Sequence, residues 1–197
     1  MTDTARGAAD AADSVDRSQP DAAVEAHSGA HAVAVAAAHG VDTMFTLSGA
    51  HVFPMYDGAV HADPPMRLLD VRHEQTAVFA AEAMGKLTRT PGLAVLTAGP
   101  GVTNGISPIT QAAFSGAPLV VIGGRAPANR WGTCSLQELD HVPIVSSVTK
   151  SARTVHDAGD IATEVDQAFT LARSSHRGPT FLDVPMDTFF ELSLIHI

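Results

Sequence analysis

Glu74 is the residue whose type and position most directly suggest chemistry. It stands in the segment 72–75 (RHEQ), directly after the apolar run 66–71. A carboxylate in the first turn of a helix is ordinarily a favourable partner of the helix dipole. The side chains of residues 77–80 behind it are all apolar, however. An apolar pocket allows a carboxyl group to exchange protons near neutral pH, so two alternatives remain for Glu74 at this point: a partner of the helix dipole or a proton-transfer group.

A glycine-rich loop at 99–105 (GPGVTNG) is the second feature, since it follows an apolar run and opens a helix. A dinucleotide-binding fingerprint has that context, but its third glycine is replaced here by Asn104, and Gly105 comes one position late. Arg125 ends the next strand, where the fingerprint has an acidic residue for the ribose. Two alternatives remain: a dinucleotide-binding module with Arg125 as a 2′-phosphate anchor, or a tight turn whose glycines permit close strand–helix contact.

Other familiar catalytic patterns are missing from the sequence. The ten histidines form no HExxH helix or comparable metal-ligand spacing, and no GxSxG nucleophile elbow occurs. We therefore expect no metal ligands from this chain. Cys134, the single cysteine, is expected to be a small buried residue without a reactive role.

The amino-acid composition limits the kinds of partner and the cellular location expected for this protein. The 197 residues are 45% hydrophobic and carry a formal net charge of -9. This charge argues against general nucleic-acid binding, which needs a basic face. No apolar run approaches the roughly 20 residues that span a bilayer, and no secretory signal is visible. We expect a cytoplasmic protein with neither nucleic acid nor membrane as a partner.

Short apolar runs alternate with helical patterns along most of the chain, which predicts βαβ units. The expected fold is α/β: a doubly wound, mostly parallel sheet of five or six strands with helices on both faces. Ligands bind beyond the carboxyl ends of the strands in such a sheet, where Glu74 and the loop 99–105 would lie. The expected strands are 42–47, 66–71, 93–97, 119–122, 150–155 and 180–184, and the expected helices are 30–39, 51–59, 72–88, 105–115 and 158–173.

The two ends of the chain differ from this pattern. Residues 1–27 are rich in Ala and Asp and carry few large apolar side chains, so we expect a disordered tail. Residues 28–190 form the expected domain. Residues 191–197 (ELSLIHI) follow the last strand without a cap and look like translated sequencing-adapter read-through, so we expect them to be non-native.

Taken together and in order, six segments resemble acetolactate synthase-like enzymes, which depend on thiamine diphosphate. The resemblance covers residues 28–190 and identifies them as the N-terminal pyrimidine-binding domain of such an enzyme. The segments are GVDTMFTLSG, VRHEQTAVFAAEAMGKLTRTPGLAVLTAGPGVTNG, APLVVIGGRAP, SLQELDHVP, VTKSAR and GPTFLDVPMD.

The resemblance implies a role for each matching residue. Glu74 would bond N1′ of the cofactor's aminopyrimidine and favour the imino tautomer that removes the thiazolium C2 proton. Cofactor-binding positions are implied around it at Ser48, Gly49, Pro100 and Asn104. Substrate-channel positions are implied at Gln137 and Lys150.

The resemblance also implies an activity and partners. The expected reaction is carboligation or decarboxylation of a 2-oxo acid such as pyruvate, as in branched-chain amino acid biosynthesis, by a homodimer or tetramer. Mg²⁺ and the diphosphate would be held by a separate C-terminal domain with a GDG…N motif, which this chain lacks, so the chain alone is expected to be inactive.

Three departures weaken the match to acetolactate synthases themselves. Leu136 replaces an aromatic residue, Met186 replaces a channel lysine, and Arg177 is displaced from the position that helps to hold FAD. A 2-hydroxyacyl-CoA or oxalyl-CoA type lyase of the same family is therefore an alternative, and FAD binding is in doubt.

Overall fold

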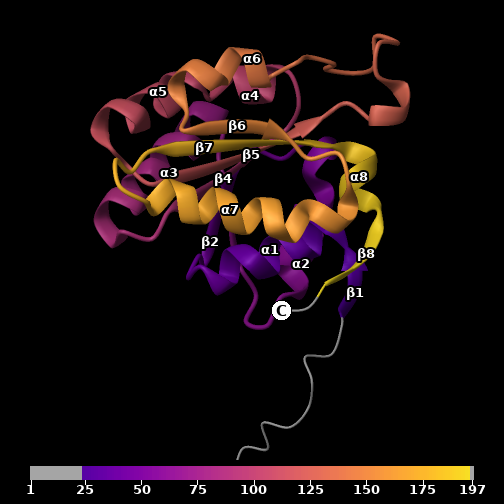
Figure 1. Cartoon of the computed structure of the whole chain (residues 1–197), viewed down its shortest axis with the longest axis horizontal. Coiled ribbons are helices and arrows are strands. Elements are labelled where there is room, and N and C mark those ends of the chain that lie inside the picture. The colour runs from indigo at the N-terminus through magenta and orange to yellow at the C-terminus, as the bar shows by residue number, and fades with distance from the viewer. Residues whose placement is uncertain (1–23, 196–197) are drawn as a thin grey trace, which may run out of the picture.

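Six parallel strands form the central sheet of the structure, a computed structural model that describes residues 24–195 (Figure 1). Their order across the sheet is β3-β2-β4-β5-β7-β6, and every neighbouring pair runs parallel. This confirms the expected α/β class. The strands are β2 (Thr43–Thr46), β3 (Arg67–Asp70), β4 (Gly92–Leu96), β5 (Leu119–Arg125), β6 (Ser151–Thr154) and β7 (Pro179–Pro185).

Helices cover both faces of this sheet, as expected. One face packs against α1 (Ser28–Ala38), α2 (Phe53–His61) and α7 (Ile161–Arg173), and Figure 1 shows α7 running along it. The other face packs against α3 (Glu74–Thr88) and α5 (Ile106–Ser115). Strand β4 serves both cores, since its alternate residues belong to different hydrophobic clusters.

Shorter elements complete the connections. They are α4 (Pro100–Asn104), α6 (Val142–Val145), α8 (Met186–Phe190) and the 3₁₀ turns Ala50–Val52, Ala128–Arg130, Ser146–Val148 and Ala158–Asp160. Among residues 24–195, no helix has the length and apolar character needed to cross a membrane. The expectation that Cys134 is buried is wrong, because it lies exposed in the segment between the 3₁₀ turn Ala128–Arg130 and α6.

A two-stranded antiparallel ribbon joins the ends of the described chain. Strand β1 (Val24–His27) pairs with β8 (Leu192–Ile195), so the prediction of a disordered tail is wrong for residues 24–27. Two further contacts reach backbone carbonyls: the Ser28 N–H donates to Glu191 O over 3.0 Å, and His31 Nε2 lies 2.9 Å from Ser193 O.

The ribbon is held mainly by backbone groups, although Ser193 Oγ also donates to Ala158 O over 3.4 Å. The contacts of Glu191 and Ser193 with α1 depend on their carbonyl groups and not on residue type. The non-native origin of residues 191–197 therefore stays a prediction. Residues 1–23 and 196–197 lie outside the described part of the chain, and with them most of the expected tail.

Candidate functional site

The candidate site lies at the switch point of the sheet, between the carboxyl ends of β2 and β4. These strands are neighbours, but the chain leaves β2 toward β3 and leaves β4 toward β5, on the opposite side. The two connections therefore diverge, and open parallel sheets bind ligands at such a switch point, which is called the crevice below. Residues 47–52 follow β2, and the glycine loop 99–105 follows β4.

Glu74 reaches this crevice from the first turn of α3. His73 precedes it as the N-cap residue, and its ring nitrogen accepts the Gln75 N–H over 3.2 Å. The Glu74 side chain is 8% exposed, and its Oε2 accepts a hydrogen bond of 2.9 Å from Asn104 Nδ2. The amide of Asn104 thus fixes the direction in which a nearly buried carboxylate points.

Two glycines bring the loops close together beside Glu74. A Cβ on Gly49 would stand 2.3 Å from Thr97 Cβ, and a Cβ on Gly101 would stand 2.7 Å from Thr97 Cγ2. The same atom on Gly101 would be 3.8 Å from Glu74 Oε1. Only glycine permits these approaches, so the loops after β2 and β4 lie in direct contact around Thr97.

Most of the sequence-predicted site residues therefore gather here. Ser48 and Pro100 are exposed beside Gly49 and Gly101, and the Ser48 N–H donates to Asp70 Oδ1 over 3.1 Å. Gln137 packs on the other side of the loop, because a Cβ on Gly99 would come within 2.9 Å of Gln137 Cβ. An oriented carboxylate is therefore available where the two loops pack closely on each other, which suits a hydrogen bond to a flat polar ring.

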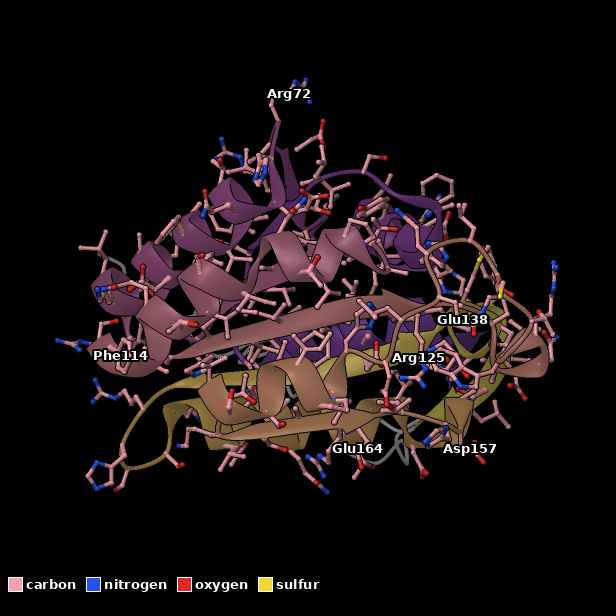
Figure 2. All side chains as sticks on the ribbon, turned by 90° about the horizontal axis from the view of Figure 1, so that it is seen from above. Arg72, Phe114, Arg125, Glu138, Asp157 and Glu164 are labelled. Atoms are coloured by element: carbon pink, nitrogen blue, oxygen red, sulfur yellow. The ribbon has the colours of Figure 1, made fainter. Side chains whose placement is uncertain are left out.

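Lys150 is the exception, and its expected place beside a substrate channel is not supported. It precedes β6 and so lies at the amino end of the sheet, where Phe114 and Arg177 share a pocket with it. Figure 2 shows Phe114 at the left side of the molecule, away from Arg125, which ends β5 at the carboxyl end of the sheet. The Lys150 ammonium group donates to Leu171 O and, over 2.7 Å, to Ser174 Oγ. Burial lowers the pKa of Lys150.

Lys150→Met is expected to lower stability without changing turnover of the full-length protein. The variant removes an ammonium group from the carboxyl end of α7, where a cation is favourable, and the expected loss is about 1–2 kcal/mol. Thermal denaturation and steady-state kinetics measure the two effects. A fall in kcat with unchanged stability would instead place Lys150 in the chemistry.

His51 is a group of the site that sequence reasoning did not single out. It is 4% exposed, its Nδ1 lies 3.1 Å from Thr97 Oγ1, and a Cβ on Gly124 would touch it. Burial lowers the pKa of His51, and a nearby His141 acts in the same direction while a backbone contact to Leu136 opposes it. No spacing pattern in the sequence marks His51 as a site residue. Only its position in the loop after β2, at the carboxyl end of a predicted strand, could have indicated it.

The lowered pKa of His51 makes stability depend on pH. An unfolded histidine binds a proton below about pH 6.5, and the folded protein binds this proton only at lower pH. The unfolded state is then favoured, so stability falls as pH decreases from about 6.5 through the folded-state pKa. His51→Gln is expected to lose less stability than the parent between about pH 8 and pH 5.5 in denaturation experiments. Parallel pH profiles would contradict this.

Arg125 does not provide the phosphate anchor that a dinucleotide site requires. Its guanidinium pairs with Asp183 and with Asp140, the latter over 3.2 Å, and lies 3.6 Å above the centre of the Trp131 ring. Two carboxylates already match its charge. The arrangement therefore favours the tight-turn interpretation of the loop 99–105 over the dinucleotide one.

Comparisons with known proteins agree with this geometry. Residues 26–144 match the family described as thiamine pyrophosphate enzyme, N-terminal TPP binding domain. The chain is 54% identical over 156 residues to the acetolactate synthase large subunit IlvG of Mycobacterium tuberculosis, and equally to a probable acetolactate synthase of Mycobacterium bovis; the match covers 79% of this chain and 28% of each relative.

A second group of relatives carries a different name. The 2-hydroxyacyl-CoA lyase 2 of Danio rerio is 35% identical over 169 residues, which cover 86% of this chain and 27% of that protein. The chain thus spans less than a third of the length of these curated relatives. Since the family match covers more than half of the chain and includes Glu74, Asn104 and the loop between β4 and α5, the chain belongs to the thiamine pyrophosphate enzymes and carries their N-terminal TPP-binding domain.

Proposed function

We propose that this chain is the N-terminal part of a carboligase or decarboxylase resembling acetolactate synthase, in which Glu74 activates thiamine diphosphate for attack on a 2-oxo acid such as pyruvate. The observation that carries this proposal is the nearly buried Glu74 carboxylate, oriented by Asn104 at the switch point of the sheet. The 54% identity to proteins named acetolactate synthases supports it.

Each residue of the crevice has a part in this function. Glu74 holds and moves a proton at the aminopyrimidine, while Asn104 binds its Oε2 and keeps the carboxylate directed. Gly49 and Gly101 let the two loops pack closely around Thr97 beside Glu74, and the exposed Ser48 and Pro100 lie next to them. Thiamine diphosphate held at these residues would supply the nucleophilic carbon that the reaction needs.

The remaining parts of the enzyme are proposed to lie outside this chain. We assign the diphosphate and Mg²⁺ to a C-terminal domain, and we place that domain on a second subunit of a homodimer or tetramer in the cytoplasm. Gln137 would line the substrate channel beside Gly99. FAD is not assigned, because Arg177 is displaced from its expected position and lies exposed on the edge of the sheet opposite Glu74.

A lyase that acts on 2-hydroxyacyl-CoA is the second candidate. The relatives named 2-hydroxyacyl-CoA lyase 2 align over a larger share of this chain than the acetolactate synthases do. Leu136 also supports this candidate: it is 76% exposed, and by the resemblance it stands where acetolactate synthases have a bulkier aromatic residue. A smaller side chain at this position would suit a substrate larger than pyruvate, such as an acyl-CoA.

The full-length protein with thiamine diphosphate and Mg²⁺ tests both candidates. Cofactor-dependent CO₂ release from pyruvate is the expected result, and cofactor-dependent aldehyde release from a 2-hydroxyacyl-CoA would favour the lyase. No activity of either kind would overturn the proposal. The 197-residue chain is the control, and pyruvate decarboxylation by it alone would show that the diphosphate site does not require a further domain.

A further inference from the structure

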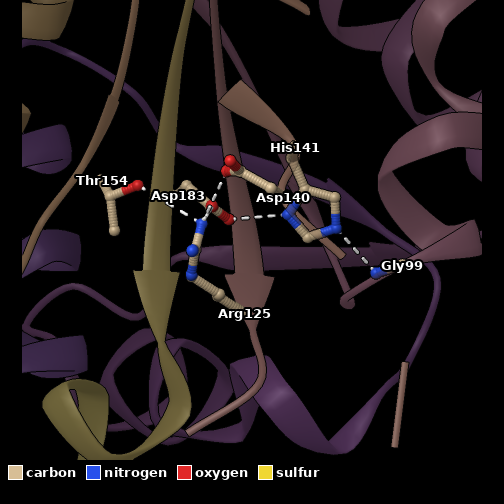
Figure 3. Close-up of polar contacts among 6 residues, drawn as sticks. All are labelled: Gly99, Arg125, Asp140, His141, Thr154 and Asp183. Atoms are coloured by element: carbon tan, nitrogen blue, oxygen red, sulfur yellow. Dashed lines mark hydrogen bonds and ion pairs between the residues drawn. The ribbon is translucent and has the colours of Figure 1, made fainter. Parts of the chain in front are cut away.

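Behind the glycine loop lies a buried polar cluster that the proposed cofactor contacts do not include. His141 precedes α6 and Asp183 lies in β7, and both side chains are 0% exposed. Figure 3 shows His141 between the Gly99 amide and the Asp183 carboxylate. The Gly99 N–H donates to His141 Nε2 over 2.8 Å, and His141 Nδ1 lies 2.8 Å from Asp183 Oδ1.

The partners of His141 determine its tautomer. A backbone N–H can only donate, so Nε2 must be the unprotonated, accepting nitrogen. Nδ1 then carries the proton and donates it to the Asp183 carboxylate, which can only accept. Asp183 therefore does more than fill space: it selects the form of His141 that is able to bind Gly99.

Arg125 fixes Asp183 in turn. Its guanidinium donates to Asp183 Oδ2 and pairs with Asp140 (Figure 3), and it also lies over the Trp131 ring. The two oxygens of Asp183 thus have different partners, one for the arginine and one for the histidine. This arrangement leaves the carboxylate no freedom to rotate without breaking a buried contact.

Gly99 is the point at which this chain of contacts reaches the candidate site. It adopts φ +58° and ψ -117°, a conformation that L side chains rarely adopt, and it directly precedes α4. That short helix carries Asn104, which orients Glu74. A shift of Gly99 would therefore move the amide group that directs the proposed catalytic carboxylate.

We propose that His141 and Asp183 are positioning residues, which hold Gly99 and the loop 99–105 in register with Glu74. The effect on catalysis rests on the function proposed above, whereas the effect on the loop does not. Hydrogen–deuterium exchange of the loop and turnover of the full-length protein therefore test separate parts of the inference.

Asp183→Asn is the most discriminating test. Asparagine has nearly the shape of aspartate, but it carries an N–H donor where the carboxylate has an accepting oxygen. Arg125 would hold the amide oxygen, so the amide N–H would point at His141 Nδ1 and force the proton onto Nε2. Nε2–H would then face the Gly99 N–H, donor against donor. In the full-length protein, exchange of the segment 97–105 is expected to accelerate roughly tenfold or more, as for a lost buried hydrogen bond.

Asp140→Asn is the matched control. It makes the same chemical change in a carboxylate that also contacts Arg125 and is 56% exposed, but whose side chain forms no hydrogen bond with the adjacent His141. Exchange of the segment 97–105 and the affinity for thiamine diphosphate are expected to stay within about twofold of the parent, since exposed ion pairs contribute little.

Two replacements of His141 decide the matter even if Asp183→Asn fails to fold. His141→Leu fills the volume without an acceptor, whereas His141→Gln offers an amide oxygen to Gly99 and an amide N–H to Asp183. The inference predicts fast loop exchange and at least a several-fold weaker affinity for thiamine diphosphate in the leucine variant, with partial recovery of both in the glutamine variant.

Three results would contradict the inference or the function on which it rests. Loop exchange unchanged in His141→Leu, or raised uniformly over the whole chain in both variants, would overturn the positioning role in favour of general stability. Loosened exchange without any change in cofactor affinity or turnover would refute the catalytic half of the inference alone. Failure of the proposed function itself would appear as undiminished turnover in a Glu74 variant, which the exchange data do not affect.

Discussion

Glu74→Gln in the full-length protein is expected to lower kcat by about 10²–10⁴-fold, the range typical for loss of a positioned general acid–base. Glutamine has nearly the shape of glutamate and still accepts the hydrogen bond that Asn104 donates to Oε2. It cannot exchange a proton, however. The melting temperature should therefore stay close to that of the parent, so that steady-state kinetics and thermal denaturation separate chemistry from folding.

Glu82→Gln is the matched control for this experiment. Glu82 lies on the same helix and is also nearly buried, but it contacts Ser115 Oγ over 2.9 Å and Lys86 Nζ over 2.8 Å, away from the crevice. Its replacement should cost about 1–2 kcal/mol of stability, discounted for the exposure of Lys86, and leave kcat unchanged. Equal losses of turnover in the two variants would remove Glu74 from the mechanism.

The sheet was predictable because its strands are short, apolar and separated by helical patterns. The expected strands 93–97 and 180–184 correspond to β4 and β7, which are buried throughout, as parallel strands must be. Strand order was not predictable, since it depends on which helix packs on which face. Strands β1 and β8 were missed because their pairing joins the two ends of the described chain and leaves no local pattern.

The candidate site was predicted only in part, for a related reason. Glu74 and Asn104 belong to segments that mark the ends of strands, so sequence order alone placed them at the same edge. Lys150 begins its strand and therefore lies at the amino end of the sheet, away from Glu74, so its place in a substrate channel stays a prediction. His141 and Asp183 were missed because their roles come from contacts between distant segments that no spacing rule describes.

Gly101→Ala is expected to disrupt the site by crowding alone. Gly101 lies in α4, where alanine suits the backbone, but the added Cβ would stand 2.7 Å from Thr97 Cγ2. Overpacking of this kind costs about 1–3 kcal/mol, and a displacement of about 1 Å at a catalytic group can cost about 10²-fold in rate. Thermal denaturation and the kcat of the full-length protein should both fall.

Thr97→Ser combined with Gly101→Ala tests whether that contact is the cause. Serine lacks the Cγ2 methyl group but keeps the hydroxyl that lies 3.1 Å from His51 Nδ1. The double variant should therefore recover most of the lost turnover, and the effects of the two substitutions should be strongly non-additive, as for residues in direct contact. If the double variant is no better than Gly101→Ala, the loss must come from Cβ entering the space beside Glu74 Oε1. Gly101 would then be required by what binds in the crevice and not by the packing of its loops.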